Sequence, residues 1–153
     1  MITKAKNQFG FTLNELLVVI FIITLFSTSV AISYSNSQRQ YAVSMVAQRL
    51  MSDIRRAQNL ALSGRVQGAV VPNRYGISVL SGTQYQLFYN ADTGASGVVD
   101  TITLSNATLS PVGASIDFSS PEATISGPQT FVIVNGSHSK RVMVDSSGVV
   151  SIN

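Results

Sequence analysis

The feature that most constrains this chain is a run of 53 residues, 11–63, that contains neither glycine nor proline. Glycine and proline are the strongest local breakers of a helix, so their absence over this length permits one continuous helix. Such a helix would be about 80 Å long at ~1.5 Å per residue. Gly64 follows directly and is a natural left-handed stop. The sequence therefore predicts a single helix over residues 11–63.

The first half of this predicted helix carries almost no charge. Residues 16–38 contain no Asp, Glu, Lys or Arg, and the stretch from Leu16 stays mostly apolar to Ile32. Those 17 residues would rise about 25 Å, the short end of what spans a bilayer. This stretch also helps to explain why only 11% of the chain is charged, against about 25% in an average soluble domain. We predict that residues 11–32 form a transmembrane or assembly half.

Two other interpretations of the apolar stretch are a buried core helix and a cleaved secretory signal. Lys4 and Lys6 would make the basic region of a signal, and Ser29-Val30-Ala31 has the small-x-small pattern of a cleavage site. Glu15 argues against a simple signal, because a carboxylate costs ~2.5 to 3.5 kcal/mol if it reaches the membrane centre. The helical pattern also continues straight through the supposed cleavage site, which favours an uncleaved helix there.

The second half of the predicted helix, residues 33–63, is an amphipathic stem. Its apolar residues recur at steps of three and four, as in a helix that buries one face. They are Val43, Val46, Ala47, Leu50, Ile54, Ala57 and Ala61. Residues 39–74 hold six Arg and one acid, Asp53, whereas residues 75–153 hold five acids and two bases. Arg49 and Arg56 can pair with Asp53 on the surface of the stem, because helix positions three or four apart are neighbours.

After a linker at residues 64–72, the composition of residues 73–153 changes to Gly, Ser, Thr, Asn and Val in short alternating runs. This pattern predicts strands at residues 75–80, 85–90, 101–104, 115–118, 131–135, 141–145 and 149–152. Hairpin turns are predicted at Asn135-Gly136 and at Asp145-Ser146-Ser147-Gly148, and long loops between residues 91 and 128. The sheet needs an apolar partner, and the stem supplies one. The predicted fold class is α+β, with the long N-terminal helix packed on a small C-terminal antiparallel β domain.

The titratable residues give little indication of catalysis. There is no cysteine, and His138 is the only histidine, which we interpret as a solvated loop residue. The carboxylates of the β region are scattered through loops and strand ends: Asp92, Asp100, Asp117, Glu122 and Asp145. They could include a Ca²⁺ site, but they lack EF-hand spacing, and turn-capping roles are the alternative. We therefore predict no catalytic residue, no metal site and no cofactor, and a protein that is not an enzyme.

The residues around Glu15 carry a resemblance to a known family. Residues 10–20, Gly10-Phe11-Thr12-Leu13-Asn14-Glu15 followed by Leu-Leu-Val-Val-Ile, resemble the prepilin processing motif of type IV pilins and type II secretion pseudopilins. Residues 48–61 are similar to the stem of H-type minor pseudopilins and the related FimT-type minor pilins. The resemblance covers residues 4–63, and the β region supports it through its strand pattern.

The resemblance implies that residues 1–10 are a leader peptide, which a prepilin peptidase removes after Gly10. Phe11 would then begin the mature chain and be N-methylated. Glu15 would meet the N-terminal amine of a neighbouring subunit during assembly. The resemblance also implies a single-pass protein of the bacterial inner membrane, with its N-terminus in the cytoplasm and its β domain in the periplasm, and an assembled state in a pseudopilus. The charges of Lys4 and Lys6 bias the topology in the same direction.

The function implied by the resemblance is that of a minor pseudopilin, which assembles through its N-terminal helix to support protein export. Its partners would be other pseudopilins or pilins, the prepilin peptidase, the inner-membrane assembly platform and the membrane. The alternative is a minor type IV pilin in adhesion, motility or DNA uptake. Cations that could contact DNA phosphates are Arg49, Arg55, Arg56, Arg65, Arg74, Lys140 and Arg141. The chain lacks the basic C-terminal tail of the DNA-binding members, since it ends Val150-Ser151-Ile152-Asn153.

Overall fold

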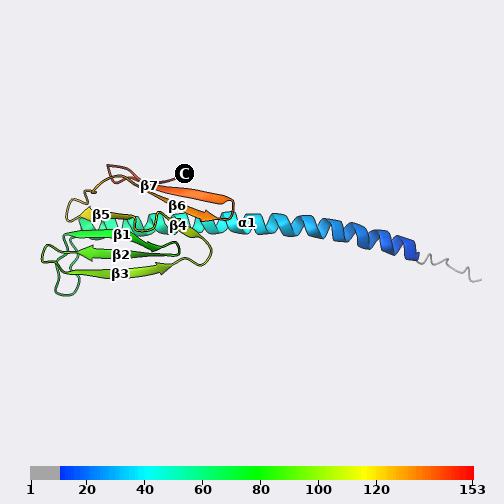
Figure 1. Ribbon diagram of the computed structural model, residues 1–153, viewed down its shortest axis with the longest axis horizontal. Helices are drawn as coiled ribbons and strands as arrows, with labels where there is room; N and C mark the ends of the chain where they lie inside the picture. Colours follow the sequence, from blue (N-terminus) through cyan, green and yellow to red (C-terminus); the bar gives the residue numbers. More distant parts are fainter. Residues whose placement is uncertain (1–10) are drawn as a thin grey trace, which may run out of the picture. The chain divides into compact units, whose positions relative to one another are not determined.

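The computed structural model describes residues 11–153, apart from the side chains of residues 28–33. It begins with one α-helix, α1, at Leu13–Leu62 (Figure 1). The predicted helix is confirmed, and its ends differ from the prediction by one or two residues. The chain divides into two compact units after Ser37, and the second unit is Gln38–Asn153. α1 contributes residues to both units.

The C-terminus of α1 is closed by the glycine that the sequence marks. Gly64 has a φ of 55°, a left-handed conformation that an L side chain rarely adopts. Its N–H donates to the carbonyl of Ala61 at 3.2 Å, and the N–H of Arg65 donates to the carbonyl of Leu60 at 3.5 Å. These two bonds are those of a Schellman motif, which satisfies carbonyls that the helix leaves without partners.

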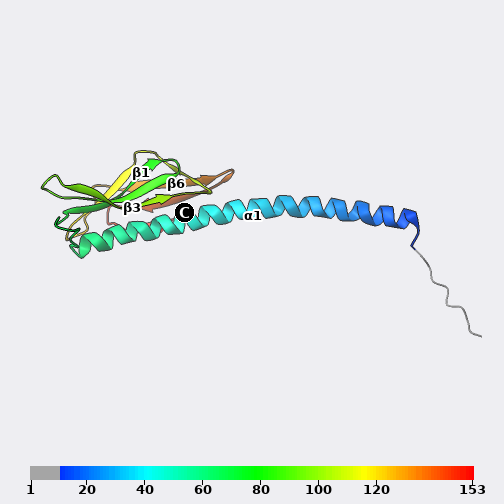
Figure 2. The same cartoon turned by 90° about the horizontal axis from the view of Figure 1, so that it is seen from below.

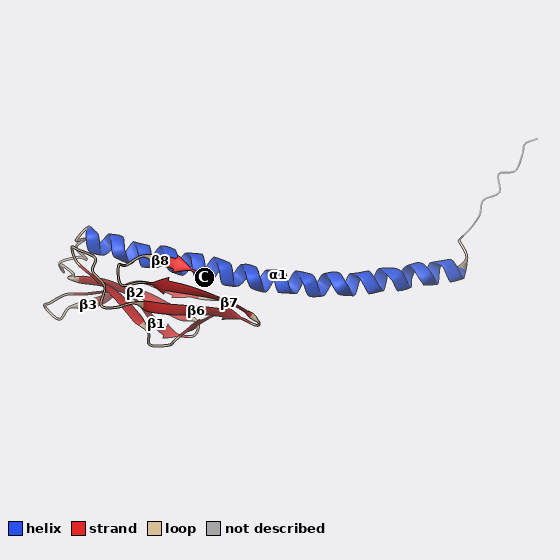
Figure 3. Ribbon diagram, turned by 90° about the horizontal axis from the view of Figure 1, so that it is seen from above, coloured by secondary structure: helices blue, strands red, loops and turns tan. Residues whose placement is uncertain are grey.

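The residues after α1 form two antiparallel sheets of four strands each. Figure 3 shows the strands grouped beside the C-terminal part of α1. The first sheet has the spatial order β3 (Ser96–Thr103), β2 (Gln84–Asn90), β1 (Arg74–Ser81) and β5 (Ser115–Ser119). The second has the order β4 (Thr108–Ser110), β6 (Gln129–Asn135), β7 (His138–Val144) and β8 (Val150–Ile152). The predicted α+β class is therefore confirmed.

The hydrophobic core lies between the stem of α1 and the strands. The periodic face of the stem is buried, with six of its seven predicted residues at most 2% exposed and Val46 half-buried. Figure 2 shows the strands lying along one side of this part of α1. The strands contribute alternate residues, which include Tyr75, Ile77, Leu87, Phe118, Phe131 and Ile133. Because every residue of this core lies between Val43 and Val150, the unit Gln38–Asn153 contains its complete core.

The two predicted hairpins are confirmed. β6 and β7 pair around the Asn135-Gly136 turn with Phe131 opposite Val142, and β7 and β8 pair around the second turn with Val144 opposite Val150. The expectation of long loops between residues 91 and 128 was wrong in part. β3 begins at Ser96, five residues before the predicted start, and β4 was missed. Both lie at sheet edges and are polar and exposed on one side, so their pairing with β2 and β6 defines them more than their own residues do.

Candidate functional site

The start of α1 is organised by Thr12. Its side-chain oxygen accepts the N–H of Glu15 at 3.3 Å, and its carbonyl accepts the N–H of Leu16 at 3.1 Å. Thr12 is therefore the N-cap, and Glu15 occupies the third position of the first turn, where the positive end of the helix dipole favours a carboxylate. The sequence itself contains a signal for this helix start, since Thr12-x-x-Glu15 has the spacing of a capping box.

The predicted processing residues lie just before this cap. Phe11 precedes the helix and is 80% exposed. Gly10, the predicted residue before the cut, lies outside the described residues, as does the rest of the predicted leader, 1–10. Glu15 is exposed, as assembly with another subunit would require. Cleavage after Gly10 and the assembly role of Glu15 stay predictions.

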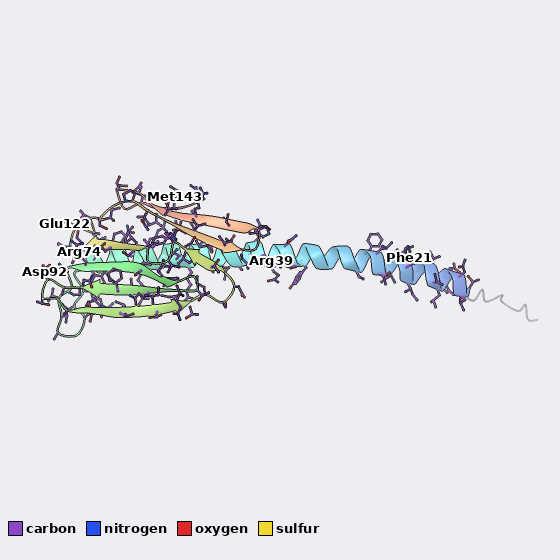
Figure 4. The ribbon with its side chains drawn as sticks, in the orientation of Figure 1. Phe21, Arg39, Arg74, Asp92, Glu122 and Met143 are labelled. Atoms are coloured by element: carbon purple, nitrogen blue, oxygen red, sulfur yellow. The ribbon has the colours of Figure 1, made fainter. Side chains whose placement is uncertain are left out.

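The segment that follows the cap exposes apolar side chains on every side of α1. Residues from Leu16 to Phe26 include ten large apolar side chains that are each 43–70% exposed, and Phe21 is labelled among them in Figure 4. The hydroxyl groups in this segment bond to the helix itself: Thr24 donates to the Phe21 carbonyl at 2.8 Å, and Ser27 to the Ile23 carbonyl at 2.8 Å. This bonding lets a hydroxyl group lie in apolar surroundings. A helix that is apolar on all sides is stable only when other apolar helices or lipid tails cover it.

Within the described part of α1, which includes most of the predicted membrane half 11–32, no stretch of helix has both the length and the mean hydropathy that crossing a bilayer requires.

On the stem, the expected pairing of Asp53 with Arg49 or Arg56 was wrong. Asp53 instead accepts the hydroxyl of Tyr85 on β2 at 2.6 Å, and Arg56 pairs with Asp100 on β3 at 3.3 Å. Tyr85 is fully buried, and this burial, followed by its bond to Asp53, raises the pKa of the phenol above its ordinary value of 10.0. The helix spacing indicated that Asp53 would pair with an arginine of the stem, but in the folded protein its partner is the neutral Tyr85 hydroxyl on β2.

We expect Tyr85→Phe to destabilise the unit Gln38–Asn153 by about 1–3 kcal/mol, because the half-buried Asp53 carboxylate would lose its donor. Denaturant unfolding of wild-type and variant fragments measures this. Since the pKa of Tyr85 is raised on folding, its contribution should be complete below about pH 10 and decline at higher pH. The matched control is Tyr89→Phe on the same strand. A Tyr85→Phe variant as stable as this control would contradict the role of the bond.

Other carboxylates of the β domain each bond to different partners and do not form a cluster among the described residues. Asp117 pairs with Arg74 at 2.8 Å and accepts the Ser126 hydroxyl at 3.0 Å, while Asp92 accepts the amide of Asn73. Asp145 caps the turn before β8, as one alternative predicted. The Ser147 hydroxyl and nearby backbone N–H groups donate to it and lower its pKa. In residues 11–153 no three His, Cys, Asp or Glu side chains come together as metal ligands would.

The interpretation of His138 as a solvated loop residue was wrong. It is the first residue of β7, lies opposite Asn135 and is half-buried. Its Nε2 atom is buried and has no hydrogen-bond partner among the described residues. The hairpin explains this placement, because the turn is so short that His138 already belongs to the ladder.

Two grooves border the stem. The first, of about 720 Å³, is lined only by residues of α1 and the segment that follows it, and it includes Arg55, Arg56 and Arg65. The second, of about 600 Å³, lies between the stem from Gln38 to Arg49 and residues of the β domain that include Leu104 and Asn106. Neither groove is lined by a carboxylate. The cations that the sequence places on the stem thus divide between two separate surfaces.

Comparisons with known proteins connect both parts of the chain to pilin-like proteins. Residues 5–31 match the model of the prokaryotic N-terminal methylation motif. Among solved structures, the minor pseudopilin EpsH from the type 2 secretion system of Vibrio cholerae is similar, with a TM-score of 0.55 and 12% identity. The similarity covers 72% of this chain and 95% of that one, and it shows a shared fold. No curated protein matches the sequence. The resemblance to type IV pilin-like proteins is thus confirmed by the N-terminal motif, and the chain shares the fold of a minor pseudopilin of the H type.

Proposed function

We propose that this chain is a minor pseudopilin of a type II secretion pseudopilus, which is cleaved after Gly10 and assembles through α1 to support protein export. The observation that carries the proposal is the combination, in one chain, of the N-terminal methylation motif with the fold of a minor pseudopilin. Its role is structural rather than catalytic. The separate placement of the β-domain carboxylates supports this.

The apolar part of α1 would have two successive environments. Before assembly it would be embedded in the bacterial inner membrane, with the leader in the cytoplasm and the β domain in the periplasm. In the filament it would pack against the corresponding helices of other pseudopilins. The exposed apolar residues from Leu16 to Phe26 support both states, since lipid tails and apolar helices offer the same kind of contact. The prepilin peptidase and the inner-membrane assembly platform would be its partners along this route.

Processing is the first step to test. Mass spectrometry of the chain recovered from membranes of the native host should show a 143-residue protein that begins with N-methylated Phe11. Gly10→Leu should leave the 153-residue precursor, because a bulky side chain would crowd a peptidase at the cleavage site. Val66→Leu, in the linker, is the control and should be cleaved like wild type. Recovery of uncleaved wild-type protein would contradict the proposal. Co-purification of the processed chain with a retractile pilus would favour the alternative of a minor type IV pilin.

A further inference from the structure

The groove between the stem and the β domain has a mixed chemical character. Its apolar lining residues are Tyr41, Met45 and Val46 of the stem and Leu104 of the β domain; Tyr41 is 74% and Met45 63% exposed. The other groups are polar and include Arg39, Arg49 and Asn106. A site with apolar lining residues and cationic groups fits a ligand that is itself amphipathic and anionic.

Arg39 and Arg49 lie in this groove without an acidic partner. Neither makes an ion pair within the described part of the chain, and no carboxylate lines the groove. Asp53 follows Arg49 by one helical turn. Its carboxylate accepts the neutral hydroxyl of Tyr85, so its negative charge still lies near Arg49. Arg39 lies over the β6–β7 turn, where a Cβ added to Gly136 would come within 3.2 Å of its Nη1 atom. Arg39 is therefore available to an anion, and Arg49 is available in part, because Asp53 offsets some of its charge.

The acidic residues of the β domain lie elsewhere. Figure 4 shows Asp92 and Glu122 at the end of the β domain opposite Arg39. Asp100 is paired with Arg56, and Asp117 with Arg74. Asp145 is held in its own turn. The end of the β domain that lies next to Arg39 of the stem thus has a local positive charge, which attracts anions independently of the small net charge of the chain.

The position of the groove in the sequence indicates where its anion comes from. Residues 16–38 are uncharged, and Arg39 is the first charged residue after them. Under the proposed function the predicted membrane half ends at Ile32. Arg39 follows it by seven residues, or about 10 Å of helix, and would therefore lie near the lipid headgroups. Phospholipid headgroups at that level carry a dense array of phosphates, and an amphipathic side chain such as Tyr41 suits the same interface.

We propose that this groove binds the headgroup of an anionic phospholipid at the bilayer surface. Arg39 contacts the phosphate, and Tyr41 lies beside it at the level of the headgroups. Arg49 lies about 15 Å further along α1 and adds to the attraction of the groove for the anionic surface. The inference rests on the proposed membrane anchoring of the preceding residues. Its consequence is that the β domain is held close to the membrane until assembly withdraws the subunit.

The test uses the fragment Gln38–Asn153, which contains its complete core and no apolar segment that could insert. We expect it to co-sediment with vesicles that contain phosphatidylglycerol and not with vesicles of phosphatidylcholine alone. Added salt should weaken the binding. Removing both cations in Arg39→Gln/Arg49→Gln should lower the partition coefficient by about twentyfold, since each cation near an anionic surface contributes roughly fivefold.

The matched control is Arg55→Gln/Arg65→Gln, which removes the same charge from the other groove and should lower binding by less than about threefold. An equal loss in both double variants would overturn the proposal, because binding would then depend on net charge alone. Nuclear magnetic resonance with sodium phosphate and with short-chain phosphatidylglycerol separates the two sources of phosphate. If inorganic phosphate shifts the Arg39 and Arg49 signals as strongly as the lipid does, the groove is a free-anion site and the lipid assignment is wrong.

The proposed function and this inference can fail separately. Vesicle binding is measured on a fragment that is neither processed nor assembled, whereas cleavage at Gly10 is measured on the full chain in cells. If the full chain is correctly processed but the fragment does not bind vesicles that contain phosphatidylglycerol, only the inferred lipid site is wrong.

Discussion

Replacing Gly76 with alanine is expected to destabilise the unit Gln38–Asn153 by about 3 kcal/mol and to lower its Tm by about 10 °C. Gly76 lies in β1, between Phe88 of β2 and Asp117 of β5. A Cβ at this position would come within 2.3 Å of the Ile116 carbonyl oxygen and within 2.8 Å of the Phe88 ring. Because the first of these atoms belongs to the backbone, relief requires a shift of β5 and of the core residues that it carries.

Two other glycines provide a graded control. At Gly82 an added Cβ would meet nothing within 4 Å, so Gly82→Ala should change stability by less than about 0.5 kcal/mol. At Gly97 the three nearest atoms would all belong to the Tyr89 side chain, with the hydroxyl oxygen at 2.5 Å, and this side chain can rotate away at a smaller cost than a backbone shift. Thermal unfolding by circular dichroism should rank the losses as Gly76, then Gly97, then Gly82. A Gly76→Ala fragment that melts with wild type would show that the sheet adapts at this position.

Replacing Glu15 with valine is expected to leave cleavage after Gly10 intact and to reduce incorporation into the filament by at least about tenfold. The proposed partner of Glu15 is the amine of Phe11 on a neighbouring subunit, and a hydrogen bond between charged groups contributes about 1.5–3 kcal/mol. An unpaired amine among apolar helices would also be costly to bury. Pull-down of tagged major pseudopilin from cells, with quantitation of this chain, measures incorporation.

The structure offers a competing role for Glu15 that this experiment must separate from assembly. Glu15 also occupies the third position after the N-cap Thr12, where glutamate and glutamine both favour the start of a helix. Glu15→Gln therefore keeps the capping position and removes the charge, whereas Thr12→Ala removes the cap and keeps the charge. We expect Glu15→Gln to fail in assembly as Glu15→Val does. Normal incorporation of Glu15→Gln would contradict the charge-pair role and leave the capping role.

Much of the fold could be predicted because its signals are local. The absence of glycine and proline, the apolar spacing from Val43 to Ala61 and the stop at Gly64 each act within a few turns of one helix. The two tight hairpins are equally local. β4 and the first half of β3 could not be predicted, because exposed edge strands are defined by hydrogen bonds to residues far along the chain.

The candidate site divides in the same way. The motif around Gly10, Phe11 and Glu15 is contiguous, so the sequence alone identified it. The groove that contains Arg39 and Arg49 could not be predicted. It forms only because β-domain residues that include Leu104 and Asn106, far along the chain, lie beside the stem. The signal available in advance was an excess of arginine on the stem, which by itself indicates a solvated face as readily as a site.

The sequence by itself determined the helix, which of its faces is buried, and the apolar segment that needs a partner, since helix periodicity and side-chain hydropathy are properties of neighbouring residues. Only the tertiary structure decided which partner each charged side chain of the stem bonds to. Asp53 bonds to Tyr85, and Arg56 bonds to Asp100. Both partners lie in the sheet, whereas the partners expected from the sequence lay one turn away on the same helix. The physical reason is that burial makes an unsatisfied polar group costly, and only the folded sheet determines which groups are buried and which donors lie beside them.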